Sequence, residues 1–281
     1  MNKDLESFIG KLKTLPTSPG VLVRLVTLFQ NPDRDIDEVA ALIRQDPTLA
    51  AGVLQHANSG ASSPEEPIGD VHDAIAWVGF GQVYQAALAK LAAQSLQVPK
   101  DSGLDPDQIW LHSAITGVCA SAVARKVHEN ESMAFTAGLL HDIGKVVLSL
   151  ADGNGYRNLT NAAGNGGLHL EQAETLFFGF GHAETGACLL QRWGLPAEVV
   201  KPVQFHHQIP QDKSLERISA VVSLGNVMAH ASVSKSTVGQ YASLEAVHAM
   251  GVLHLKEEDL TELLLDSQDE IKQLTGSLAS A

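Results

Sequence analysis

The chain is short of positive charge, of cysteine and of aromatic residues. Its 281 residues include 19 Lys and Arg against 32 Asp and Glu, a formal net charge of −13, and no basic cluster offsets this excess locally. Nucleic acid and anionic lipid are therefore poor partners. Two cysteines, Cys119 and Cys188, are too few for the disulfide framework of a secreted domain, and both lie in Ala-rich helical patterns. We interpret them as packing residues.

Long apolar runs are also missing. No charge-free apolar run approaches the roughly 20 residues that span a bilayer. The first sixteen residues, MNKDLESFIGKLKTLP, carry charges early and lack the apolar stretch of a signal peptide. We therefore expect a cytoplasmic protein without membrane contact.

What the chain does have is helical periodicity. Hydrophobic residues make up 44% of it, enough to bury a core. They recur at helical spacing almost throughout, while β-type alternation is scarce, so we predict an all-α fold. The segment VPKDSGLDPDQ is rich in breakers and indicates a boundary. We expect an N-terminal helical half over residues 1–104, a helical site-bearing subdomain over 105–235 and a C-terminal extension over 236–281, the last a pair of amphipathic helices.

Within these parts, the pattern predicts particular helices. Capping residues place helix starts at Asp35 and Asp46, and Gly79 is expected to close a third helix. The site-bearing helices are predicted over about 106–128 and 131–150, from 181 to 193, from 196 to the His206-His207 pair, and over about 214–231. The Gly-rich run at 163–167 is expected to separate the second of these from a short helix ending near residue 178.

Histidine is the most informative residue type. Five of the 12 histidines fall, with one aspartate, in or next to these helices: His112, His141, His182, His206, His207 and the carboxylate Asp142. A lone histidine is more often a core or surface residue than a ligand. We interpret the others in that way: His56, His72, His128, His169, His230, His248 and His254. The joint arrangement of the first set predicts a site.

Neutral imidazoles and a carboxylate form a ligand set for divalent transition metals. The carboxylate of Asp142 can bridge two ions, and helices of a bundle each direct one or two side chains to a common centre. The expected cofactor is a divalent transition metal, with room for two ions, and Fe, Mn or Ni is favoured over Mg or Zn.

The order of these motifs resembles the HD superfamily of metal-dependent phosphohydrolases. The resemblance implies that His112, His141 and Asp142 hold one metal with a late residue, and that the later histidines, His182, His206 and His207, hold a second. Lys145 in HDIGK would sit where that family places a lysine that contacts phosphate. Asp142 and Lys145 are thus the implied catalytic residues.

A closer resemblance is to the HDOD domain, an HD relative found in bacterial signalling proteins. Its N-terminal half is similar to the run LPTSPGVLVRLVTLFQ and to IRQDPTLA with its Ala-Asn-Ser ending. In the second half, WLHS, LLHDIGK, GHAETGACLLQRWGLP and FHH have the look of the family. This resemblance implies a helical N-terminal subdomain packed on an HD-like bundle, and a regulatory module that contacts a signalling protein.

Two departures bear on activity. Asn226 stands where the hydrolases have their last metal-binding aspartate, and an amide oxygen brings no charge. The run after the histidine pair, QIPQDK, lacks the GYP loop of cyclic-dinucleotide hydrolases, so hydrolysis of cyclic di-GMP is not expected. Three functions remain open: a signalling module with a metal site, a phosphohydrolase of nucleotides or small phosphoesters, and a module that binds a nucleotide without cleaving it.

Overall fold

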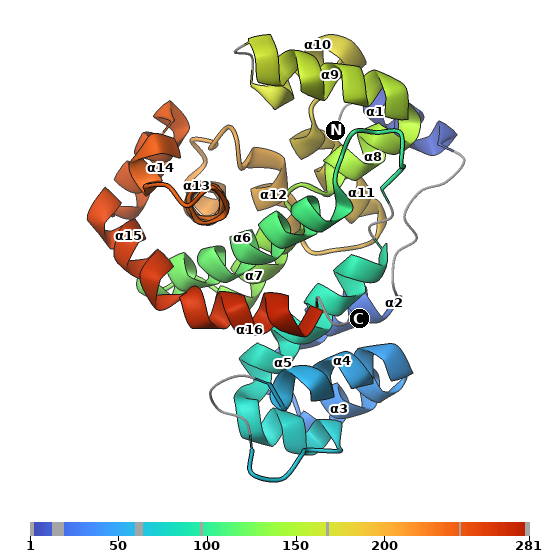
Figure 1. Ribbon diagram of the computed structural model, residues 1–281, viewed down its shortest axis with the longest axis vertical. Helices are drawn as coiled ribbons and strands as arrows, with labels where there is room; N and C mark the ends of the chain where they lie inside the picture. Colours follow the sequence, from blue (N-terminus) through green and yellow to red (C-terminus); the bar gives the residue numbers. More distant parts are fainter. Residues whose placement is uncertain are drawn as a thin grey trace.

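The structure is a computed structural model that describes residues 3–12, 20–59, 64–95, 98–166, 169–241 and 243–278. Within these ranges all regular secondary structure is helical, which confirms the all-α prediction (Figure 1). The prolines of the LPTSPG run lie outside the described residues. The predicted division at residues 104 and 235 stays a prediction.

The N-terminal half is a small helical unit, drawn in blue to cyan in Figure 1. The unit consists of α2 (Gly20–Gln30), α3 (Ile36–Arg44), α4 (Pro47–Ala57) and α5 (Val71–Ser95). Helix α1 (Lys3–Lys11) lies apart from it, against α11 (His182–Arg192). The predicted starts are confirmed, because the side chains of Asp35 and Asp46 accept hydrogen bonds from the first-turn amides of α3 and α4. At Gly79 the backbone leaves the helical conformation, with φ +87° and ψ 161°, so α5 is two helices that meet at a kink and the predicted helix end at Gly79 is confirmed. This conformation favours glycine.

The central bundle carries the predicted site. Its helices are α6 (Pro106–Lys126), α7 (Glu131–Leu140), α8 (Ile143–Ala151), α9 (Gly153–Gly166), α10 (Leu170–Phe178), α11 (His182–Arg192), α12 (Ala197–Phe205) and α13 (Lys213–Ser234). Helix α6 packs between α7 and α13 and is buried from Ser113 to Ala124. At Gly225 of α13, an added Cβ would lie 2.8 Å from the amide nitrogen of Ala120, so the two backbones are nearly in contact.

Two helix predictions in this bundle are wrong. The continuous helix over 131–150 is interrupted, because α7 ends at Leu140 and α8 begins at Ile143. His141 and Asp142 form the turn between them, with Asp142 at φ −97° and ψ 5°. The predicted separator at 163–167 is also incorrect, since α9 continues to Gly166 and packs against α8 and α10. Tertiary packing here outweighs the weak helix propensity of Gly and Asn.

The C-terminal extension holds more helix than the predicted pair. It comprises the 3-10 turn η1 (Val238–Tyr241), α14 (Leu244–Leu253), α15 (Glu257–Asp266) and α16 (Gln268–Leu278). Helix α14 packs on α13, while α16 lies across α6 and reaches α4 and α5, as the red ribbon in Figure 1 shows. The extension therefore touches both the N-terminal half and the central bundle.

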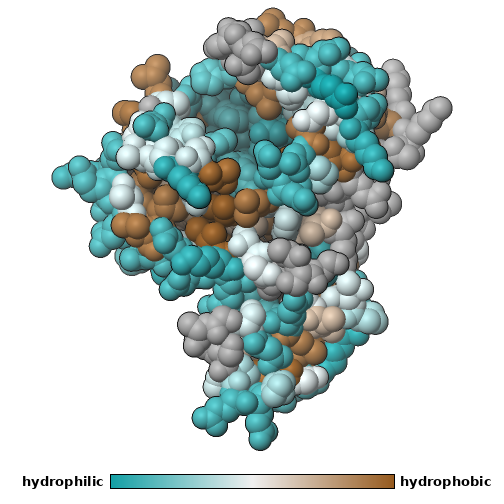
Figure 2. Space-filling view, in the orientation of Figure 1, coloured by the Kyte–Doolittle hydropathy of each residue, from teal (hydrophilic) through white to brown (hydrophobic). Residues whose placement is uncertain are grey.

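The most apolar segments of the chain are buried by this packing, and hydrophilic residues lie at the surface. The segment Glu131–Ala151 is long and apolar enough to cross a bilayer, but 89% of its most apolar window is buried inside the fold, as in a core helix. Both cysteines are buried, as predicted. Hydrophilic residues cover much of the face seen in Figure 2, including the walls of a hollow in its upper part.

Candidate metal centre

The structure brings the predicted ligands together around Asp142. His112 comes from α6, His141 and Asp142 from the α7–α8 turn, His182 from the first turn of α11, and His206 with His207 from the end of α12. Five helices thus meet at one carboxylate.

Asp142 contacts histidines on both of its oxygens. Oδ2 lies 3.3 Å from Nε2 of His141 and 3.8 Å from Nε2 of His112, while Oδ1 lies 3.3 Å from Nε2 of His182. Two groups of potential ligands result, His112 with His141 and Asp142, and His182 with His206 and His207; within each group the ligand atoms lie within 4.8 Å of one another. The Nε2 atoms of His182 and His207 are 3.0 Å apart.

Several of these atoms are buried without a hydrogen-bond partner in the described structure. They are Nε2 of His112, His141 and His206, Oδ1 of Asp142 and Oδ1 of Asn226. A buried polar atom left unpaired costs about 1–3 kcal/mol, so a set of them that includes three histidines of the cluster and Asp142 itself needs an explanation. Imidazole nitrogens and carboxylate or amide oxygens are metal ligands, and the residues present therefore fit a divalent ion.

Protonation states agree with such an ion. Burial lowers the pKa of His112 and His206 well below the usual value and that of His207 to about 2, so these imidazoles are neutral. Burial opposes the charge of Asp142, but His141 and Lys145 outweigh it and hold the pKa of that carboxyl well below its usual range. Neutral imidazole and ionised carboxylate are the forms that bind metal.

Lys145 provides the cation at the edge of the cluster. Its Nζ lies 2.6 Å from Oδ2 of Asp142, and its side chain is 18% exposed. A charge in this position can pair with Asp142 and face an anion arriving from solvent.

Glu174, which no sequence motif predicted, is fully buried on α10. Its Oε2 accepts hydrogen bonds from the backbone N–H of His182, at 2.8 Å, and pairs with Nδ1 of that ring at 2.5 Å. Its Oε1 accepts a bond from the hydroxyl of Tyr156 at 2.5 Å. Burial alone would raise the pKa of Glu174, but its interactions with His182 and the hydrogen bond from Tyr156 outweigh that effect and lower it. This carboxylate fixes the ring of His182 with Nε2 turned to the cluster.

Backbone carbonyls orient two further rings. Nδ1 of His141 lies 2.7 Å from the carbonyl oxygen of Gly138, and Nδ1 of His206 lies 2.8 Å from that of Val203. Each bond assigns the proton to Nδ1 and leaves Nε2 available as a ligand.

Helix α13 contributes one predicted residue and one that was interpreted differently. Asn226 is 9% exposed and its Oδ1 has no partner. One turn later, the ring of His230 contacts that of His112, with centroids 4.5 Å apart. Because residues four apart share a helix face, Asn226 lies on the side of α13 that faces α6. His230, which was interpreted as an ordinary histidine, borders the cluster.

Two glycines allow this assembly. A Cβ on Gly144 of α8 would overlap the carbonyl oxygen of His182 and lie 2.7 Å from the amide nitrogen of Gly186. A Cβ on Gly186 would lie 3.1 Å from Cγ2 of Ile143. Helices α8 and α11 therefore cross backbone to backbone, which brings His182 to Asp142.

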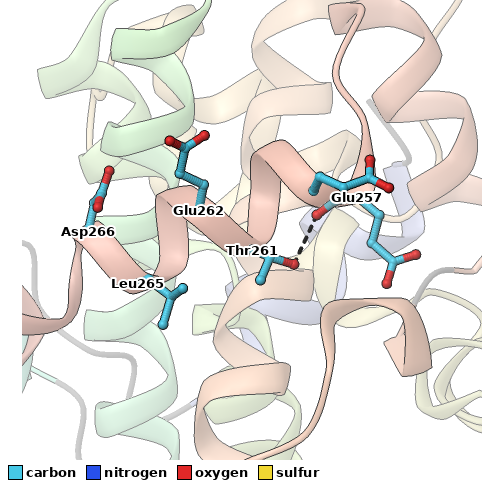
Figure 3. A pocket seen from close by; sticks show the side chains of 6 residues that line it. Glu257, Thr261, Glu262, Leu265 and Asp266 are labelled. Carbon is cyan, nitrogen blue, oxygen red and sulfur yellow. Dashed lines mark hydrogen bonds between the residues drawn. The ribbon is translucent and has the colours of Figure 1, made fainter.

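A separate surface groove lies on α15. It is lined by Glu257, Glu258, Thr261, Glu262, Leu265 and Asp266, all on the solvent side of one helix (Figure 3). The only bond drawn there is within the helix, from the Thr261 hydroxyl to the carbonyl oxygen of Glu257. This groove is the solvated acidic face of an amphipathic helix.

Comparison with known proteins places these features in a family. The HDOD domain model matches residues 15–209. A crystal structure of an HDOD domain protein of unknown function from Geobacter sulfurreducens superposes with a TM-score of 0.79, at 24% identity over 97% of this chain and 96% of the other. One from Shewanella amazonensis, described as a "Putative phosphohydrolase", gives a TM-score of 0.78 at 21% identity over 98% of both chains.

A curated relative is an uncharacterized protein of Treponema pallidum. It is 29% identical over 206 residues, which are 73% of this chain and 40% of the relative. The chain therefore spans less than half the length of that protein.

Proposed function

The chain belongs to the HDOD family, and we propose that it is a bacterial, cytoplasmic signal-transduction module that contacts a protein partner and holds a divalent transition metal at its centre. The observation that carries the metal part is the gathering of buried, unpartnered ligand atoms around Asp142. Membership of the family supports the signalling part of the proposal. The residues that match the HDOD model, 15–209, include most of the N-terminal helical half as well as the metal centre.

The residues divide between two metal positions. His112, His141 and Asp142 would hold one ion, with Oδ1 of Asn226 as a further oxygen ligand, and the second would lie among His182, His206 and His207. A set rich in imidazole and poor in carboxylate favours Fe, Mn or Ni over Mg. When bound, such ions polarise a phosphoryl oxygen and lower the pKa of a bound water towards about 7.

The chain's own groups prepare this centre for an anion. Asp142 stays ionised and is shared by both groups of histidines. Glu174 holds the His182 ring in place. Lys145 is the cation that would neutralise a phosphoryl oxygen. A phosphate group, carried by a nucleotide or a small phosphoester, is therefore the ligand chemistry that we propose.

Thermal unfolding tests the metal part. Adding Mn²⁺ or Fe²⁺ to chelated protein should raise Tm, because a ligand that binds only the native state adds about 2.7 kcal/mol at a hundredfold excess over Kd. Asp142→Asn and His206→Ala should lose most of this shift. The exposed His248→Ala on α14 should keep it. An equal shift in all variants would show that the ions bind elsewhere.

A second candidate function is metal-dependent phosphohydrolysis. It is favoured by the pairing of Lys145 with Asp142 at the exposed edge of the cluster. A panel of nucleotides and phosphomonoesters, assayed with Mn²⁺ and Fe²⁺, should then show turnover that falls roughly 10²- to 10³-fold in Lys145→Ala. If the wild type turns over no faster than Asp142→Asn, the phosphohydrolase function is excluded and only the metal-binding signalling module remains.

A further inference from the structure

Helix α1, although it precedes the N-terminal unit in the sequence, packs against the helix that carries His182 (Figure 1). Its neighbour is α11, and an added Cβ on Gly10 would lie 3.6 Å from a guanidinium nitrogen of Arg192 near the end of that helix. Leu5 and Ile9 of α1 are buried. By its contacts, α1 therefore belongs to the bundle that holds the metal centre.

An aromatic cluster joins α1 to the turn that leads into His182. The ring of Phe8 meets that of Phe180 edge to face, with centroids 4.9 Å apart, and that of Phe178 in the same manner at 6.2 Å. Phe178 is the last residue of α10, and the buried Phe180 lies two residues before His182. Edge-to-face aromatic pairs attract each other beyond the area that they bury. Phe8 therefore holds the turn between α10 and α11 in place.

The same cluster continues to the residues behind the His182 ring. The ring of Phe178 lies 6.4 Å from that of Tyr156, which is fully buried on α9. The Tyr156 hydroxyl donates to Oε1 of Glu174, while Oε2 of Glu174 pairs with the backbone N–H and with Nδ1 of His182. Both oxygens of this carboxylate are thus held by groups whose positions depend on how α9, α10 and α11 pack together.

We propose that α1 is a strap whose contact at Phe8 positions His182 for the metal, with Tyr156 as a second positioning residue. Phe8 fixes the turn before α11, Glu174 fixes the ring, and Nε2 of His182 then faces Oδ1 of Asp142 at 3.3 Å. The inference rests on the proposed function, because it treats His182 as a metal ligand. A protein partner that displaces α1 would weaken metal binding, so the strap offers a means of regulating the centre.

Phe8→Ala tests the strap in the full chain. Competition with a chromophoric chelator should show an Mn²⁺ affinity lower by about 2- to 30-fold, the range in which residues remote from a site act on it. Tyr156→Phe, which removes the hydroxyl and keeps the ring, should lower the affinity about tenfold or more, as the loss of an outer partner of a ligand does. Leu176→Ala, at an exposed position of α10, is the control and should leave the affinity unchanged.

A double-mutant cycle separates positioning from a general loss of stability. In a Glu174→Gln background, Phe8→Ala should lower the Mn²⁺ affinity by much less than it does alone, because the route through Glu174 is already broken. Amide hydrogen exchange in chelated protein gives a readout without metal. The His182 amide, which donates to Glu174, should exchange faster in Phe8→Ala, while the amide of Val222 in the core of α13 keeps its rate.

The outcomes distinguish the strap from the metal centre itself. A wild-type affinity retained in both Phe8→Ala and Tyr156→Phe, or losses that simply add in the Glu174→Gln background, would overturn the strap and leave the metal centre intact. A lower Tm in Phe8→Ala without a change in Mn²⁺ affinity would likewise make Phe8 a packing residue only. A wild type that binds no Mn²⁺ would overturn the metal part of the proposed function together with the strap.

Discussion

The central histidines differ in what holds each ring. His141 and His206 are held by backbone carbonyls, whereas His182 depends on the carboxylate of Glu174, which is itself bonded to Tyr156. A carboxylate behind a ligating histidine raises its basicity and fixes its orientation. The sequence could not reveal Glu174, because nothing in the pattern of α10 distinguishes it from Glu171, the other acidic residue of that helix. Only the Gly-rich turn FGFGH after α10 indicates that α11 must begin close by.

Glu174→Gln tests this support. The amide keeps the shape but loses the charge, so we expect metal affinity to fall about 10- to 100-fold with the fold retained. Competition with a chromophoric chelator measures the affinity. Glu184→Gln, on the exposed side of α11, is the matched control and should leave it unchanged. Equal affinity in both variants would show that Glu174 does not act on the metal.

Asn226→Asp addresses the missing charge. A carboxylate in place of the buried amide oxygen should strengthen metal binding, and it should lower the Tm of the chelated protein because a buried charge without a partner is costly. Thermal unfolding with and without Mn²⁺ measures both effects. The exposed Asn161→Asp should show neither. A metal-induced shift smaller than that of the wild type would contradict the placement of Asn226 beside the metal.

At the scale of elements, the turn between α7 and α8 is the largest departure from the predicted helices. The apolar positions at Leu139, Ile143, Val146 and Val147 continue the same helical period across it, so periodicity alone predicts one helix. The break turns His141 and Asp142 into the bundle and lets α8 cross α11 at Gly144. The hydrophobic pattern predicts which side of a segment is buried, but it does not predict where a helix is interrupted so that its side chains can reach a ligand.

Gly144→Ala tests the crossing. The added methyl group would overlap the carbonyl oxygen of His182, so we expect the protein to lose about 1–3 kcal/mol of stability or more and to bind metal poorly. Gly251→Ala in α14 is the control, because a Cβ there meets nothing within 4 Å. That change should stabilise the protein by roughly 0.5–1 kcal/mol. Denaturant unfolding measures both, and a neutral Gly144→Ala would refute the close crossing.

Helix α16 connects the two halves next to a buried histidine. Nε2 of Gln273 donates to the carbonyl oxygens of His56 and Ser59, and His56 is 3% exposed. Burial lowers the pKa of His56 below its usual 6.5. The unfolded chain therefore takes up a proton at a pH at which the folded protein does not. The stability linked to this group is complete above about pH 6.5 and is lost as the pH falls below that value.

His56→Gln should remove this part of the pH dependence. Between pH 6.5 and 5, we expect the free energy of unfolding of the wild type to fall more steeply than that of the variant, by up to about 1.4 kcal/mol per pH unit. Above pH 7.5 the two slopes should agree. Denaturant unfolding of chelated protein at each pH gives the comparison, and parallel curves throughout would contradict the assignment.

At the scale of the whole molecule, the fold class, the family and the residues that meet around Asp142 follow from the sequence. Helical periodicity predicts the fold class, and the spacing of the motifs predicts the family and the residues of the cluster. Helix α9 did not follow, because its run of Gly and Asn disfavours helix and only packing against α8 and α10 specifies it. The contact between His112 on α6 and His230 on α13 could not be predicted either, because the two residues lie far apart in the sequence.

The metal content of the whole protein tests the account most directly. Protein purified without chelator and incubated with Fe²⁺ or Mn²⁺ should retain at least one ion per chain after gel filtration, measured by plasma mass spectrometry. Asp142→Asn should retain much less, because the carboxylate shared by both groups of histidines is gone. A wild type that retains no more metal than Asp142→Asn would contradict the metal centre.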